Sequence, residues 1–124
     1  LSLDVSAEIV LLGDFNEDPD EMNVQSLKTV GLTSLMEPML GTPNVGTYVY
    51  NGEDLFYDQI IVSEGLKDKK GLGFDSESVM ILDLPKYRQQ EGDYAHYPFR
   101  FWAGNSLLGG YSDHLAVRVT IIKI

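Results

Sequence analysis

Three short polar blocks contain the side chains of this chain that are best suited to chemistry. They are Gly-Asp-Phe-Asn at residues 13–16, Tyr-Asp-Gln-Ile at residues 57–60 and Tyr-Ser-Asp-His at residues 111–114. Carboxylates, a carboxamide and an imidazole can position a water, move protons, bind a phosphate or hold a hard cation. Each block lies beside or within an apolar segment, so together they predict a polar site at strand ends in a sheet.

The pair Asp113–His114 is the clearest acid–base candidate. An aspartate beside a histidine can fix the imidazole tautomer and raise its basicity. His114 could then act as a general base or donate to a phosphoryl oxygen. The alternative is a solvated histidine at the start of a strand, because a lone Asp-His pair is a weak motif.

The first block places Asp14 and Asn16 two residues apart, which puts both side chains on one side of an extended chain. A carboxylate and a carboxamide so placed can hold a cation, position a water or hydrogen-bond a phosphate. The alternative is an Asx-rich turn that caps the following helix.

In the second block, Asp58 precedes the apolar residues 60–62 and is expected in a buried strand. A carboxylate there is costly unless it is paired or bound to a cation. A salt bridge or a backbone hydrogen bond is the purely structural alternative to a catalytic role.

The elements that must position these blocks follow from hydrophobic patterning and turn residues. In chain order we expect a strand at residues 9–12, a helix at 22–30 ended by Gly31, a hairpin between strands at 47–50 and 56–62, a strand at 78–82, an irregular excursion at 85–110 and a final strand at 115–124. This order predicts an α/β or α+β fold with a mainly antiparallel or mixed sheet and helices on one face. No segment obviously covers the other face.

The excursion at residues 85–110 is rich in aromatic residues and glycine. Loops of this length are more often functional than idle. Its aromatic side chains, together with Arg88 and Arg100, could stack on bases or sugars. We expect them instead to form the packed core of the loop, because Phe and Trp are usually buried.

Composition narrows the classes of function. The 124 residues suit one domain, and their net charge of −10 disfavours tight binding to a nucleic-acid backbone. The absence of cysteine excludes disulfides, thiolate metal sites and a thiol nucleophile. No apolar run is long enough to predict a membrane span. The compartment stays open, with a secreted or periplasmic parent as one option.

Taken together, the three blocks resemble the C-terminal half of the endonuclease/exonuclease/phosphatase superfamily. This superfamily includes pancreatic deoxyribonuclease, abasic-site endonucleases, neutral sphingomyelinases and inositol-polyphosphate phosphatases, and residues 57–60 are most similar to the deoxyribonuclease version. The resemblance covers residues 9–119. It implies one half of a four-layer α/β sandwich, so residues 1–124 are expected to be the C-terminal half of such a domain.

The resemblance implies a metal-dependent phosphoester hydrolase of the phosphodiesterase or endonuclease type. Asp14 would orient or deprotonate the attacking water or help to protonate the leaving group. Asn16 and His114 would bind the phosphate, and His114 could also serve as base. Asp58 would support the phosphate-binding histidine of the other half. Asp14 and Asp113 would be metal ligands, with Mg²⁺ expected and Mn²⁺ or Ca²⁺ as alternatives.

The family pattern also implies that the site is incomplete. Its N-terminal half supplies an Asn, the main metal-binding Glu and often a second His, and only 12 residues precede Gly13 here. We therefore expect this chain alone to be inactive and to bind metal weakly. An exposed sheet face would receive an N-terminal half or a second copy. The substrate could be a nucleic acid, a phospholipid or a sugar phosphate. The alternative function is a catalytically silent half-domain that binds or self-assembles.

Overall fold

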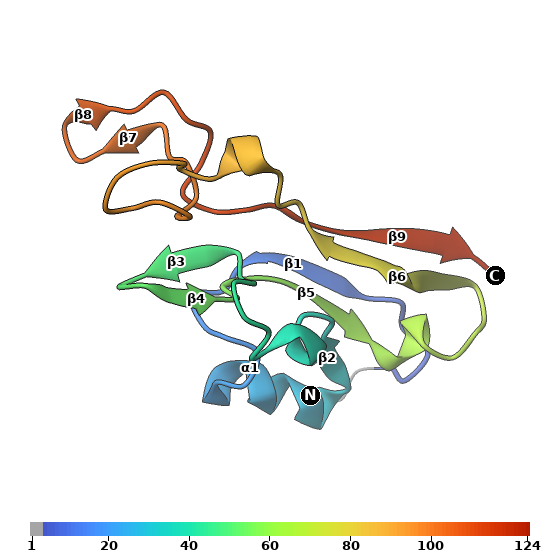
Figure 1. The fold of residues 1–124 in the computed structure, drawn as a ribbon. Helices are drawn as coiled ribbons and strands as arrows, with labels where there is room; N and C mark the ends of the chain where they lie inside the picture. Colours follow the sequence, from blue (N-terminus) through green and yellow to red (C-terminus); the bar gives the residue numbers. More distant parts are fainter. Residues whose placement is uncertain (1–3) are drawn as a thin grey trace.

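Strands dominate the computed structural model, which describes residues 4–124 (Figure 1). Every strand pairing in this part of the chain is antiparallel, and the helical segments are short, so the fold is of the α+β class. The four-layer sandwich stays a prediction. Within residues 4–124, no helix has the length and apolar character that a bilayer span requires.

The central sheet has three strands in the order β1 (Val10–Asp14), β5 (Asp58–Ser63), β2 (Leu32–Ser34). The expected strands at residues 9–12 and 56–62 are confirmed with shifted ends, whereas β2 was not anticipated from the sequence pattern. The register places Asp14 directly opposite Asp58. Residues that face each other in this way have neighbouring side chains on one face of the sheet.

One face of the central sheet is covered by the helical segment expected at residues 22–30. It consists of α1 (Met22–Ser26) and the 3-10 turn η1 (Leu27–Val30), and Gly31 ends it with a left-handed φ of 79°. Val24 and Leu27 pack against Ile61 on this face.

The other face is covered over β5, which corrects the expectation for that strand, whereas Leu12 of β1 is 69% exposed on the same face. Strand β6 (Leu72–Ile81) pairs with β9 (Val117–Lys123), and Phe74, Val117 and Val119 of this pair pack with Ile60 and Val62 of β5. Both predicted strands exist, although β6 begins at Leu72 instead of residue 78. Because β5 is covered on both sides, Ile60, Ile61 and Val62 are all buried.

The expected hairpin is correct at its turn and wrong in its second strand. Strand β3 (Tyr48–Tyr50) pairs with β4 (Glu53–Leu55) across Asn51 and Gly52, which have φ of 48° and 80°. Positive φ at both central residues is typical of the tight hairpin turn, and a two-residue turn fixes the pairing to the residues next to it. Residues 58–63 are thus free to join the central sheet.

The excursion between β6 and β9 contains a 3-10 turn and a small hairpin. Its elements are η4 (Pro85–Tyr87), β7 (Trp102–Ala103) and β8 (Ser106–Leu107). Outside the excursion, the chain has two further 3-10 turns, η2 (Glu37–Met39) and η3 (Glu64–Leu66). The expectation of a packed loop core is wrong for three aromatic residues. Tyr94 is 62% exposed, Phe101 is 49% exposed and Trp102 is 54% exposed. The excursion lies over the β3–β4 hairpin (Figure 1). A hydrogen bond of 2.7 Å joins the two, in which the Gly52 amide donates to the Tyr97 hydroxyl.

Candidate active site

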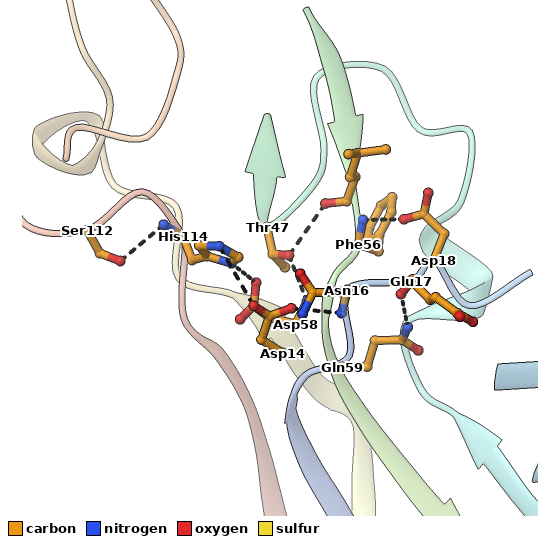
Figure 2. Close-up of polar contacts among 11 residues, drawn as sticks. Asp14, Asn16, Glu17, Asp18, Thr47, Phe56, Asp58, Gln59, Ser112 and His114 are labelled. Carbon is orange, nitrogen blue, oxygen red and sulfur yellow. Dashed lines mark hydrogen bonds and ion pairs between the residues drawn. The ribbon is translucent and has the colours of Figure 1, made fainter. Parts of the chain in front are cut away.

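Three of the predicted site residues meet where β1 ends and β5 begins (Figure 2). Asp14 is the last residue of β1, Asp58 is the first of β5, and His114 precedes β9. The antiparallel pairing of β1 with β5 brings the two carboxylates together, and the imidazole lies between them.

The imidazole of His114 is held by Asp58. Its Nδ1 lies 2.6 Å from Asp58 Oδ2, and both side chains are mostly buried, with 24% and 18% of their surface exposed. A carboxylate at this distance favours the tautomer with the proton on Nδ1, which leaves Nε2 free to accept a proton. This contact corrects the expectation that Asp113 is the partner of His114, and it shows that Asp58 supports a histidine of this chain.

Asp14 faces the other nitrogen of the same ring. Its Oδ2 lies 4.0 Å from His114 Nε2, which is too long for a hydrogen bond. The separation is short enough for one oxygen atom, of a water or of a phosphoryl group, to contact both groups. Asp14 and His114 thus border a position that a reacting oxygen can occupy.

Asn16 follows in an Asx turn, as the structural alternative predicts, but this turn does not cap α1, whose N-cap is Glu21. The backbone amide of Asn16 donates to Asp14 Oδ1 at 2.9 Å, which is the hydrogen bond of an Asx turn. The φ of Asn16 is 51°. The turn uses only one oxygen of Asp14, so the other remains directed to His114. Asn16 itself is exposed, and its carboxamide forms no hydrogen bond with residues 4–124.

The segment after Asn16 is attached to β5 and to Phe56, two residues before β5. Gln59 is fully buried, and its Nε2 donates to the Glu17 carbonyl oxygen at 2.6 Å. Asp18 accepts a hydrogen bond from the amide of Phe56. Burial raises the pKa of Asp18 above its usual value, with this hydrogen bond opposing the shift and nearby carboxylates adding to it. These contacts fix the position of the turn that carries Asp14 and Asn16.

Thr47 joins the hairpin to the site and was missed by sequence reasoning. It is fully buried, its hydroxyl accepts from the Asp58 amide at 3.0 Å, and its carbonyl oxygen accepts from the Leu115 amide at 2.7 Å. One residue therefore fixes the backbone next to both partners of the Asp58–His114 pair. A threonine at the start of a β-rich segment is ordinary, so no sequence pattern indicates this role.

Two tyrosines and the imidazole of His114 form a stack of three rings. The Tyr48 ring stacks on His114 with centroids 4.6 Å apart and planes 19° apart, and Tyr57 stacks on Tyr48 at 5.6 Å and 21°. Burial, followed by nearby carboxylates, raises the pKa of Tyr57, so its phenol stays neutral at physiological pH. The stack limits rotation of the imidazole. Tyr48 was also missed, because an aromatic residue in a strand usually indicates packing.

Asp113, the second proposed metal ligand, is exposed, and its carboxylate forms no hydrogen bond or ion pair within the described part of the chain. Residues 4–124 hold no group of three or more His, Asp or Glu side chains that could bind a metal ion. Asp58 is bonded to His114, and Asp14 uses one oxygen in its Asx turn. Because hard divalent cations require about six oxygen ligands, these residues do not fit a metal site by themselves.

The sequence was compared with models of protein families. The model described as Endonuclease/Exonuclease/phosphatase family matches residues 1–123. Neither a search of curated proteins nor a search of solved structures found a match. The match covers nearly the whole chain and includes all three polar blocks.

Proposed function

The chain belongs to the endonuclease/exonuclease/phosphatase family, and we propose that it supplies the acid–base side of a phosphoester hydrolase site. The observation that carries this proposal is the imidazole of His114, bonded to Asp58 through Nδ1 at 2.6 Å and facing Asp14 through Nε2 at 4.0 Å. An imidazole oriented on one nitrogen and open on the other is the arrangement required for general acid–base catalysis.

In the proposed reaction, a water attacks phosphorus while the ester P–O bond breaks. Asp14 orients this water or takes its proton, and His114 Nε2 either shares that role or, when protonated, donates a hydrogen bond to a phosphoryl oxygen. Asp58 stabilises the positive charge that develops on the ring. The free carboxamide of Asn16 donates to another phosphoryl oxygen. The leaving oxygen takes up a proton from the acidic form of one of these groups.

Members of this family generally use divalent metals, and an ion of this kind neutralises charge on the phosphate when it is bound. We propose Mg²⁺, with Mn²⁺ or Ca²⁺ as alternatives, and assign Asp14 and Asp113 as the ligands from this chain. Since these two carboxylates are too few, the remaining ligands would come from the N-terminal half that the family resemblance implies. Residues 1–124 would then be the C-terminal half of the domain.

A second candidate function is assembly without catalysis. The observation in its favour is apolar surface at the end of the β6–β9 pair, where Ile122 and Ile124 lie on one face and are 41% and 57% exposed. Exposed apolar residues that lie together on a sheet mark interaction sites. We propose that this surface contacts an N-terminal half or a second copy of the chain, whether or not the assembly is active.

Substitution at the pair of Asp58 and His114 separates the two functions. We expect His114→Ala and Asp58→Asn to lower kcat for bis-(para-nitrophenyl) phosphate about 100-fold or more, measured with Mg²⁺ on the native protein that carries this chain. Asp93→Asn, an exposed carboxylate outside the site, is the control and should behave as wild type. Unchanged turnover in His114→Ala would refute the hydrolase proposal and favour the assembly module.

A further inference from the structure

A groove lies next to the ring stack of the candidate site, between the β3–β4 hairpin and the excursion. Its volume is about 580 Å³, within the range of pockets that bind small molecules. Tyr48 lines this groove, and its ring stacks on His114. A molecule bound in the groove would therefore be adjacent to the phosphoester site.

The walls of the groove are aromatic with amide groups between the rings. Tyr50 and Tyr94 line it and are 58% and 62% exposed, although the Tyr94 ring also packs edge-on against Tyr97 at 5.3 Å. Asn51 and Gln89 also line it, and neither side chain forms a hydrogen bond within residues 4–124. Flat rings and free amides are the groups that bind a planar heterocycle by stacking and by its polar edge.

Arg100 gives the groove a positive charge. The other arginine of the excursion, Arg88, is neutralised by Asp83 through two hydrogen bonds of 2.8 and 2.9 Å. In contrast, no carboxylate of the described residues lies within ion-pair distance of Arg100. This free guanidinium can bind a phosphate in the groove and would repel a cationic ligand.

We propose that this groove is the subsite for one nucleotide unit of the substrate. The base lies against Tyr50 and Tyr94, and Arg100 holds the phosphate attached to that unit. The acidic surface opposes the long backbone of a duplex, so the ligand is a mononucleotide or the end of a short single strand. This inference rests on the proposed phosphoester hydrolysis and adds the class of substrate to it.

Calorimetric titration of the chain with adenosine monophosphate, adenosine, ribose phosphate and phosphocholine tests the proposal. We expect adenosine monophosphate to bind most tightly. Tyr94→Ala should weaken its binding about tenfold, and Arg100→Gln should remove the preference for adenosine monophosphate over adenosine. Tyr94 is exposed, so this variant is expected to fold, which thermal melting would check.

Two matched variants are the controls. Trp102→Ala removes an aromatic side chain of similar exposure, 54%, that does not line the groove. Arg118→Gln removes a positive charge on β9, outside the groove. Both should bind adenosine monophosphate as wild type does. No binding of this ligand, tighter binding of phosphocholine or ribose phosphate, or equal losses in the controls would overturn the proposal.

The two proposals fail in different ways, because binding is measured here without turnover. If adenosine monophosphate does not bind but hydrolysis still depends on His114, the groove assignment is wrong and the hydrolase proposal stands. If adenosine monophosphate binds as described but His114→Ala retains full turnover, the hydrolase proposal is wrong and the groove remains a nucleotide site.

Discussion

The partner of His114 is decided by a contact between distant segments. Asp113 precedes it in a bend, and its carboxylate forms no hydrogen bond or ion pair within the described residues. Asp58 is 56 residues away in sequence and lies 2.6 Å from the ring. The acid–base pair is therefore formed between chain segments, and either segment alone would carry only half of it.

Asp18 gives a residue-scale prediction about pH. Its pKa is raised in the folded state, so its contribution to stability is present when it is protonated and is lost as the pH rises through the folded pKa. Asp18→Asn keeps an oxygen that accepts from Phe56 and removes the charge. We expect the variant to gain stability over wild type from roughly pH 3 to roughly pH 7, by up to about 1 kcal/mol because solvent partly screens the group.

Urea denaturation across this pH range would measure that gain. Asp93→Asn serves as the control, because Asp93 is exposed and is not among the carboxylates that act on Asp18. The stability of Asp93→Asn should stay close to that of wild type. A stability gain in Asp18→Asn that shrinks as the pH rises would contradict the raised pKa.

At the scale of elements, the site depends on how the β3–β4 hairpin is attached to β5 and to the segment before β9. Thr47 makes both attachments. Thr47→Val retains shape and leaves the Asp58 amide without its acceptor, so we expect a loss of about 1–3 kcal/mol in the free energy of unfolding. Thr47→Ser keeps the hydroxyl and should lose less. Equal stability of the Val and Ser variants in urea denaturation would show that the hydrogen bond does not matter.

The segment that carries His114 passes very close to the excursion at Gly110. A Cβ atom at Gly110 would lie 2.1 Å from the Phe99 carbonyl oxygen, a separation that no backbone tolerates without moving. We expect Gly110→Ala to destabilise the chain by about 1–3 kcal/mol and to displace His114 from Asp58. Thermal melting and the NMR signal of the His114 Nδ1 proton would report these two effects.

Gly109→Ala is the control for Gly110→Ala, because it introduces backbone strain without a close contact. Gly109 has a φ of 76° but has open space around its Cβ position, so alanine there should cost only about 1 kcal/mol of strain. The Asp58–His114 pair should persist in that variant. Loss of the Nδ1 proton signal in Gly109→Ala but not in Gly110→Ala would contradict the assigned contact.

For the whole molecule, the exposed apolar residues at the end of the β6–β9 pair predict association. We expect the chain to self-associate at concentrations of about 100 µM, because burying several such side chains stabilises a contact. Ile122→Glu should leave it monomeric in sedimentation velocity. Val30→Glu adds the same charge on the layer formed by α1 and η1 and should associate as wild type does. A monomeric wild-type chain would exclude self-assembly through this surface.

The sequence by itself determined the features that depend on neighbouring residues. The strand at residues 9–12, the end of the helical segment at Gly31 and the turn at Asn51 and Gly52 were all predicted, because conformational preference and hydrophobic period act over a few residues. The side chains able to carry the chemistry were also evident, since their types and spacing are properties of the chain and matched a family pattern.

Only the tertiary structure decided which groups touch. It selected Asp58 as the partner of His114, gave Thr47 and Tyr48 their places at the site, and packed β6 and β9 against β5 on the second face of the central sheet. These contacts join residues that are far apart in the chain. They are set by strand register and packing, which act through space, so no local pattern in the sequence records them.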